Sequence, residues 1–399
     1  MILVYTYYNS PWKMESGDDV RIHTISSSLA KSSNLVVFNL SSMVKISSRS
    51  IHDGVIYISL PRKLYSLISR VTQWSRHYDL NPLIKLTHYV DELIVAVKLR
   101  RELKRAKTIL VFGSMSLFSF YSRLLGVQNT IIYDPLANYS QTLYLRSRRS
   151  VLELLRYGLH LSLHKLEVKA SSIVVYPSKI DLENATRTFK PKKAIIIPNP
   201  MPICYESMKE YVSLRAKRGD YDKPHFILLA GGRGKNNEEA VKMTIEVFNV
   251  LPPEKFRLFI TGPWEDMKRH VKNLSIILPG VVSREKLKEL LAIADYGLSP
   301  IFSHSSGTFL KVLSYLSAGL EIIATPQSLA GINSIEASAV YIVKNKEDYA
   351  RVIWNIISSY KRSEHRRIKL CNDAYEDLKL PLKYILSMVD CTNNNKIRQ

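Results

Sequence analysis

The chain has few cysteines and no long apolar run. Its 399 residues include only three cysteines, Cys204, Cys371 and Cys391, which are far apart and lack the spacing of a metal site. They indicate a reducing cytosol, and we expect no cysteine chemistry. No stretch of about eighteen apolar residues occurs, so a membrane-spanning helix is not expected. The opening segment MILVYTYYNSPWK lacks a basic leader, so we expect no signal peptide and a cytoplasmic protein.

Acidic residues are scarce relative to basic ones. Lys and Arg number 57 against 35 Asp and Glu, which gives a formal net charge of +22. The first 200 residues hold 28 basic and 13 acidic groups (+15), and the remainder hold 29 and 22 (+7). Such a field attracts phosphate-rich partners: anionic lipid head groups, polyprenyl phosphates or nucleic acid. Adaptation to an acidic or hot habitat is the alternative explanation of this charge.

Short apolar, β-branched segments recur along the chain, each followed by a longer helical pattern. Continuous apolar strands that alternate with helices predict parallel sheets covered on both faces. Two successive sets predict two doubly wound, Rossmann-like α/β domains, which we expect over residues 1–200 and 201–374. Residues 198–224, rich in proline and charge, are typical of the linker between them. The expected strands are residues 2–7, 34–40, 54–60, 108–113, 129–134, 172–178, 193–199, 225–230, 257–261, 274–278, 296–299, 320–325 and 339–343.

Residues 305–325, SSGTFLKVLSYLSAGLEIIAT, read as a small-residue loop, an amphipathic helix and an apolar strand. Gly307, Lys311 and Ser314 line a stripe that differs from the apolar face. The helix start offers unpaired backbone N–H groups and the positive end of the helix dipole beside a lysine. This arrangement favours a phosphate. The alternative is a buried βα unit of any doubly wound domain.

A second phosphate candidate follows the strand at 225–230. The turn GGRGK, residues 231–235, lets the backbone approach a ligand, and Arg233 and Lys235 add positive charge. A Walker A loop is excluded, because no Gly-Lys-[Ser/Thr] follows at the required spacing. The alternative is a structural turn with solvated charges.

These segments resemble the donor site of the retaining glycosyltransferases with the GT-B fold, family four and its relatives in group 1. The resemblance covers most of residues 172–345 and, more weakly, the first 170. It implies two Rossmann-like domains that face each other across a cleft, with a last helix at about 375–399 packing back on the first domain. The residues that match the family's signature are Gly307, Thr308, Lys311, Tyr315, Ala318, Gly319, Ile322, Ile323, Ala324 and Thr325.

The resemblance also implies a set of donor contacts. The diphosphate of a nucleotide sugar would lie on Gly307, Thr308, Arg233 and either Lys235 or Lys311. The backbone near Gly280 and Val281 would border the nucleobase, and Gly17 would approach the gap between sugar and acceptor. Members of this group usually need no bound metal, so we expect neither a metal nor another cofactor.

Two departures from the family pattern concern charged residues. The family's paired glutamates, eight positions apart, correspond here to Ser306 and Ser314. A serine makes one hydrogen bond where a carboxylate makes two charge-assisted ones, so a weaker or different grip on the nucleotide sugar is implied. The family's lysine after the glycine turn corresponds to Glu238, and Lys235 comes three residues earlier.

Two residues are candidates for the chemical step. Asp134 ends a predicted strand and could orient the acceptor hydroxyl or act as a base, with capping of a turn as the alternative. His304 precedes the phosphate loop and could approach the leaving group. In retaining members of the family, charges around the diphosphate stabilise its departure more than any protein nucleophile acts.

The resemblance and the charge predict a retaining glycosyltransferase with a lipid-linked or surface glycan acceptor at the cytosolic membrane face. The basic segment 144–165 forms a helix with Leu152, Leu155 and Leu159 on one side. Such a helix could lie on an anionic membrane surface or cover its own sheet with a wet basic back. A nucleic-acid acceptor and a catalytically silent sugar-nucleotide-binding protein remain as alternatives.

Overall fold

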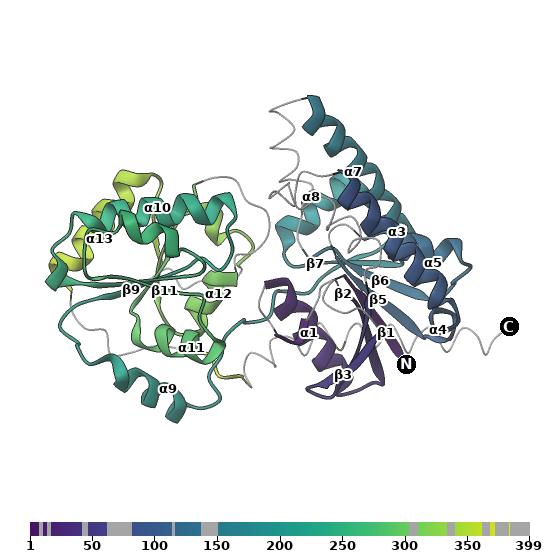
Figure 1. Ribbon diagram of the computed structural model, residues 1–399, viewed down its shortest axis with the longest axis horizontal. Helices are drawn as coiled ribbons and strands as arrows, with labels where there is room; N and C mark the ends of the chain where they lie inside the picture. Colours follow the sequence, from purple (N-terminus) through teal and green to yellow (C-terminus); the bar gives the residue numbers. More distant parts are fainter. Residues whose placement is uncertain are drawn as a thin grey trace. The chain divides into compact units, whose positions relative to one another are not determined.

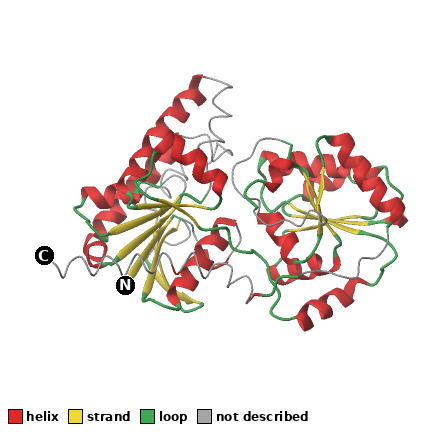
Figure 2. Ribbon diagram, turned by 180° about the vertical axis from the view of Figure 1, so that it is seen from behind, coloured by secondary structure: helices red, strands yellow, loops and turns green. Residues whose placement is uncertain are grey.

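The computed structural model describes residues 1–7, 11–13, 17–41, 47–61, 82–113, 116–136, 151–302, 310–332, 340–360, 368–371 and 383. The chain divides into two compact units, one holding Met1–Pro198 and the other beginning at Asn199. This division falls beside the boundary predicted after residue 200. Each unit has helices on both faces of a β-sheet (Figures 1 and 2). The predicted C-terminal helix lies outside the described residues, apart from Lys383.

The first unit is built on an eight-stranded sheet with the order β3-β4-β2-β1-β5-β6-β7-β8. Its paired strands are parallel, except that β3 runs antiparallel to β4. The predicted strands of this half of the chain are all present. They are β1 (Ile2–Thr6), β2 (Leu35–Ser41), β4 (Val55–Pro61), β5 (Thr108–Phe112), β6 (Thr130–Asp134), β7 (Ile173–Tyr176) and β8 (Ala194–Ile196), and β3 (Ser48–His52) is additional.

The additional strand forms a hairpin that the sequence prediction missed. Asp53 and Gly54 connect β3 to β4 with φ angles of 49° and 76°, as a two-residue hairpin turn requires. His23 fastens this turn to the first helix, because its Nε2 lies 2.8 Å from Asp53 Oδ2 and its Nδ1 lies 2.6 Å from the Tyr57 hydroxyl. His23 is therefore a packed histidine, with 3% of its surface exposed.

The alternation of side chains along the strands separates two apolar layers in the first unit. One layer, with Val4 and Val37, lies under α1, and the other, with Leu3 and Tyr5, lies under the remaining helices. Figure 1 shows α1 apart from α3, α5 and α7. The helices are α1 (Gly17–Ala30), α3 (Pro82–Lys98), α4 (Arg100–Arg105), α5 (Phe118–Leu124), α7 (Val151–Ala170) and α8 (Lys179–Phe189).

The second unit is built on a parallel six-stranded sheet with the order β11-β10-β9-β12-β13-β14. The chain enters at β9 in the middle, moves outward through β10 and β11, and then returns to β12 on the other side of β9. Ligands of such sheets bind where the order reverses, at the carboxyl ends of these two central strands. The strands are β9 (His225–Leu229), β10 (Arg257–Thr261), β11 (Ile276–Gly280), β12 (Tyr296–Ser299), β13 (Glu321–Ala324) and β14 (Val340–Ile342), all as predicted.

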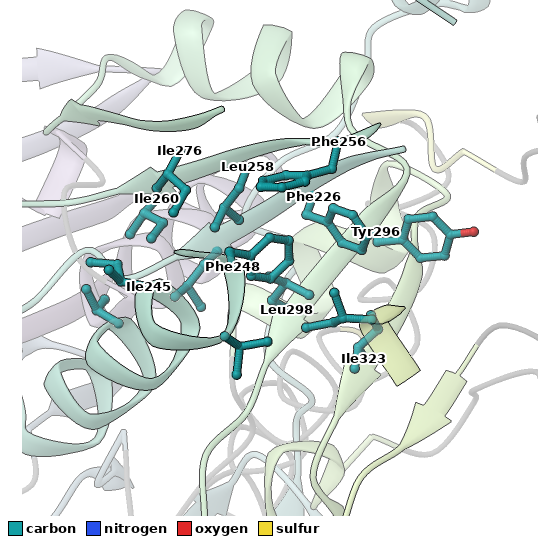
Figure 3. Close-up of a cluster of buried hydrophobic side chains, with 14 of the residues drawn as sticks. Phe226, Ile245, Phe248, Phe256, Leu258, Ile260, Ile276, Tyr296, Leu298 and Ile323 are labelled. Atoms are coloured by element: carbon teal, nitrogen blue, oxygen red, sulfur yellow. The ribbon is translucent and has the colours of Figure 1, made fainter. Parts of the chain in front are cut away.

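Helices cover both faces of this second sheet. α10 and α13 pack on one face, where Phe248 meets Phe226 and Phe256 with ring centroids 5.1 Å apart in each pair (Figure 3). α9, α11 and α12 pack on the other face. Apolar burial on both faces explains why the strands read as continuous apolar runs. The helices are α9 (Met208–Arg215), α10 (Lys235–Asn249), α11 (Arg284–Ile293), α12 (Leu310–Ser317) and α13 (Lys346–Ser359).

Candidate functional site

Two helices begin near the reversal point of the second sheet. β9 ends at Leu229 and leads through the glycine turn into α10, while β12 ends at Ser299 and precedes α12, which begins at Leu310. Because β9 and β12 are paired parallel neighbours, both connections leave the same edge of the sheet. Part of the second connection falls outside the described residues, and with it fall His304, Ser306, Gly307 and Thr308.

The glycine turn has room around it. A Cβ atom built on Gly231, Gly232 or Gly234 would meet nothing within 4 Å, and none of these residues has a positive φ. Neither packing nor backbone conformation within this unit therefore requires glycine here. The turn leaves its backbone open to solvent, directly before the fifteen-residue helix α10. Gly234 is the N-cap residue of α10, so no cap side chain covers the first N–H groups of the helix.

The charges beside this turn are exposed and paired. Arg233 makes two contacts with Asp266: Nη2 lies 2.5 Å from Oδ1 and Nη1 lies 3.1 Å from Oδ2. Its guanidinium also lies 5.4 Å from the ring centroid of Trp264. Lys235, at the first position of α10, lies 3.5 Å from the carboxylate of Glu239. Both ion pairs are open to water, so their charges can exchange partners at little cost.

Lys311 connects the two helix starts. Its Nζ donates to Asn237 Oδ1 at 2.8 Å, and Asn237 Nδ2 donates to the carbonyl of Gly232 at 2.9 Å. This chain of contacts joins the first turn of α12 to the glycine turn. Burial lowers the pKa of Lys311 to about 8. Asn237 was not among the residues predicted for the site, although an amide in the first turn of a helix behind a glycine loop is a recognisable signal.

The two departures from the family pattern have local partners. Ser314 is buried, and its hydroxyl donates to the Leu310 carbonyl of its own helix at 3.1 Å. Glu238 accepts from Lys242 one turn along α10 at 2.6 Å. Neither residue supplies a positive charge to the glycine turn.

The carboxyl ends of β9, β10 and β11 are tied together. Gly262 donates its N–H to the carbonyl of Gly280 at 2.9 Å, and a Cβ on Gly262 would lie 2.0 Å from the carbonyl oxygen of Ala230. Gly280 itself has a φ of 79°, which an L side chain rarely adopts. Val281 follows with 74% of its surface exposed. The backbone at this edge of the sheet is therefore fixed, and the apolar side chain of Val281 beside it is exposed.

Tyr315, one of the signature residues, has a structural role. Its hydroxyl accepts from the Leu229 N–H at 2.9 Å and donates to the Leu298 carbonyl at 3.0 Å, which links the ends of β9 and β12. Its ring occupies the space above Gly297, where a Cβ would lie 2.3 Å from the ring. Gly319, with a φ of 68°, lies two residues after Ser317, the last residue of α12. Part of the signature therefore positions the site rather than touching a ligand.

In the first unit, Asp134 lies at the end of β6 as predicted, in a buried ion pair. Arg21 donates from Nε to Asp134 Oδ2 at 2.9 Å, and the Leu136 N–H donates to Oδ1 at 2.9 Å. Both charged side chains are 1% exposed. This geometry matches the capping alternative, and a role for Asp134 as a base stays a prediction. Gly17 begins α1.

Two buried glutamates in the first unit, Glu92 and Glu167, have the raised pKa values that are typical of catalytic sites. Burial raises the pKa of Glu92 to about 8 and that of Glu167 to about 7. However, all four of their carboxylate oxygens accept hydrogen bonds, mostly from the residues that start α5. The contacts are Ser116 Oγ (2.9 Å), the Tyr5 hydroxyl (3.3 Å) and Leu117 N (2.7 Å) to Glu92, and Ser119 N (2.9 Å) and Phe120 N (3.0 Å) to Glu167. The pair is a helix cap.

Among the described residues, no group of three or more His, Cys, Asp and Glu side chains is arranged to hold a metal ion. None of the helices that the structure describes is both long and apolar enough to cross a membrane. The absence of a resident cofactor stays a prediction.

Comparison with solved structures defines the class of fold. Sucrose-phosphate synthase from Thermosynechococcus elongatus superposes with a TM-score of 0.69 at 12% identity over 100% of both chains. An α,α-trehalose 6-phosphate synthase from Burkholderia multivorans gives 0.62 at 13% identity, covering 100% of this chain and 98% of its own. WaaG, a glycosyltransferase involved in lipopolysaccharide biosynthesis, gives 0.62 at 14% identity over 90% and 91%. The chain therefore has the two-unit GT-B fold that its sequence predicts.

The family comparison adds the particular group. Residues 225–359, from β9 to the end of α13, match the family described as glycosyl transferases group 1. A search of the curated proteins returns no match. The match lies within the second unit and contains the signature around Lys311.

Proposed function

We propose that the chain transfers a sugar from a nucleotide-diphosphate donor, whose diphosphate binds at the starts of α10 and α12. The observation that carries this proposal is the Lys311–Asn237–Gly232 chain, which gathers a lysine and an uncapped helix start around an open glycine turn. An anion placed there would meet backbone N–H groups, the helix dipole and positive side chains. One of the superposing structures, from E. coli, is described as bound with UDP-2-fluoro glucose.

Arg233 and Lys235 are the exposed cations of the proposed site. Arg233 is 52% exposed and Lys235 63% exposed at the side chain, so each can leave its carboxylate partner for a phosphate. Lys311 is a further cation, held against Asn237. In a transfer reaction these charges would stabilise the negative charge that develops on the departing diphosphate. The resemblance to the family's donor site also supports four further proposed contacts, at His304, Ser306, Gly307 and Thr308. We propose retention of anomeric configuration, because the signature resembles retaining families.

Binding of UDP, measured by titration calorimetry, tests the donor site. We expect Arg233→Ala and Lys311→Ala each to weaken binding about tenfold or more, because each removes a charge-assisted contact. Lys242→Ala is the matched control, since Lys242 lies further along α10 and pairs only with Glu238 among the contacts described. Unchanged affinity in both site variants would exclude this assignment. Release of sugar from a nucleotide sugar then separates an enzyme from a silent binder.

The proposed acceptor is a lipid-linked or surface glycan at an anionic membrane, and two helices of the first unit support this. On α7, Val151, Leu154, Leu155 and Leu159 are 55–76% exposed. The same helix buries His160, His164 and Glu167 instead. Leu155 and Leu159 therefore lie on the outer side of α7, while the helix also packs on its own sheet through Val168.

α3 repeats the pattern. Val90, Leu93, Ile94 and Val97 are 36–52% exposed at helical spacing. The exposed residues that follow are all basic: Lys98, Arg100, Arg101, Lys104, Arg105 and Lys107. Aliphatic side chains next to a row of cations complement a bilayer whose head groups are anionic. The net charge of +15 on the first 200 residues has the same sign. Aromatic residues do not interleave with the basic segments of the sequence in a recognised binding module, which ranks a nucleic-acid acceptor lower.

Sedimentation with vesicles tests this membrane arm. We expect binding to vesicles with phosphatidylglycerol, weaker binding to phosphatidylcholine alone, and loss of binding in the Leu155→Gln/Leu159→Gln variant. Leu274→Gln is the control, because Leu274 is 95% exposed in the second unit. A concentration-dependent dimer that the double variant disrupts, without vesicle binding, would overturn the membrane arm and leave the donor site untouched.

A further inference from the structure

Two cysteines of the second unit are joined. Cys204 and Cys371 form a disulfide with their Cα atoms 5.0 Å apart, although 167 positions separate them in the sequence. The prediction that the cysteines carry no chemistry is therefore wrong. Spacing did not reveal the pair because the fold, not the local sequence, brings them together. The argument from cysteine usage for a reducing cytosol loses its basis, and the cytoplasmic location stays a prediction.

The disulfide is embedded in a small backbone ribbon. Cys371 donates its N–H to the Tyr205 carbonyl at 2.9 Å, and Tyr205 donates its N–H to the Lys369 carbonyl at 3.3 Å. Lys369 in turn donates its N–H to the carbonyl of Ser317, the last residue of α12, at 2.7 Å. Residues 368–371 therefore lie between the segment around Tyr205 and the end of the helix that carries Lys311.

The disulfide joins residues that lie close to the two ends of the second unit. The second unit begins at Asn199 and its chain ends at Asp377. The disulfide follows the first of these points and precedes the second by only a few residues, so it closes almost the whole unit into one loop. Cross-linking a loop of this length removes much of the conformational freedom of the unfolded chain. Cys204 is buried, whereas Cys371 is partly exposed, so a thiol reagent can reach the bond from one side.

We propose that Cys204 and Cys371 form a redox-controlled disulfide that fastens residues 368–371 against the end of α12. Oxidation joins the two sulfur atoms and releases two protons and two electrons. The electrons pass to an incoming disulfide such as glutathione disulfide, which leaves as two thiols. Reduction by a dithiol reverses the exchange. In the reduced protein the backbone ribbon and the apolar packing of Ile368 and Leu370 still hold residues 368–371, without the covalent link.

Alkylation with a maleimide and intact mass measurement tests the bond itself. After treatment with glutathione disulfide, unfolded wild-type protein is expected to take up one maleimide, at Cys391, and three after reduction. Uptake of three without reduction would overturn the proposal. The Cys391→Ser variant is expected to take up none until it is reduced, which excludes pairing of Cys391 with either partner.

Thermal unfolding tests the effect of the disulfide on stability. We expect the reduced wild type to melt roughly 10 °C below the oxidised protein, because the closed loop is long. The Cys391→Ser variant is expected to keep this difference. Cys371→Ser is expected to melt like the reduced wild type, with or without reductant. Equal melting temperatures of the oxidised and reduced wild type, which need no variant to fold, would overturn the stabilising role.

Discussion

The Nζ of Lys311 lies 2.8 Å from Oδ1 of Asn237, so the first turn of α12 and the first turn of α10 are joined by one hydrogen bond. These helices follow β12 and β9, the strands between which the sheet order reverses. The contact gathers residues far apart in the sequence into one candidate phosphate site. It also holds the ammonium group of Lys311 beside the amide of Asn237.

The first prediction concerns the pH dependence of donor binding. The pKa of Lys311 is lowered to about 8, so the side chain is largely charged at pH 7 and largely neutral at pH 9. An anion binds the charged form, and the affinity for UDP is therefore expected to fall roughly tenfold between these two pH values. The Lys311→Arg variant, which stays charged, is expected to show a much smaller change. Calorimetry across this pH range makes the comparison, and parallel pH profiles would contradict it.

Two glycines give opposite predictions. Gly297→Ala, on the central strand β12, places a Cβ 2.3 Å from the ring of Tyr315, so we expect a loss of about 1–3 kcal/mol in the free energy of unfolding. Gly232→Ala meets no atom within 4 Å, so stability is expected to change little while UDP affinity falls. Denaturant unfolding and calorimetry on both variants distinguish the two roles. A stable Gly297→Ala protein would show that the ring moves aside freely.

Asp295 is the centre of a buried ionic cluster that fixes the segment entering the second sheet. It accepts from Arg218 Nη1 at 2.7 Å, Arg215 Nη2 at 3.1 Å and the His225 N–H at 2.9 Å. The Arg218 side chain is fully buried. Asp295→Ala leaves this guanidinium without its carboxylate, so we expect a loss of about 3–5 kcal/mol in the free energy of unfolding.

The control for Asp295 is the exposed acid at the candidate site. Asp266→Ala removes the partner of Arg233 at a position open to water, so it is expected to leave the melting temperature nearly unchanged. A similar stability loss in both variants, measured by denaturant unfolding, would contradict the account of the Asp295 cluster.

The sequence predicted the fold well because both faces of each sheet are covered. Continuous apolar runs mark such strands, and every predicted strand is present. The hairpin at Asp53–Gly54 was missed, although Asp-Gly between β-prone residues is a turn signal. β3 lies at the edge of its sheet and reads as polar, SRSIH, so an apolar pattern does not reveal it.

The site was less accessible to sequence reasoning. The signature pointed to Lys311 and the glycine turn pointed to Arg233, but the family pattern gave no reason to consider Asn237. The sequence pattern also did not predict which side of α7 is buried, because the buried side includes His160, His164 and Glu167. Helical spacing assigns leucines to a face without saying which face packs. Cys204 and Cys371 required the three-dimensional fold.

Amide hydrogen exchange with and without UDP is the sharpest test of the proposed diphosphate site. We expect UDP to slow exchange at residues 231–238, the glycine turn and the first turn of α10, and at the start of α12. At a UDP concentration near the wild-type dissociation constant, we expect a much smaller effect in the Lys311→Ala variant. Binding of UDP that protects only other segments, with residues 231–238 unchanged, would contradict the proposed site.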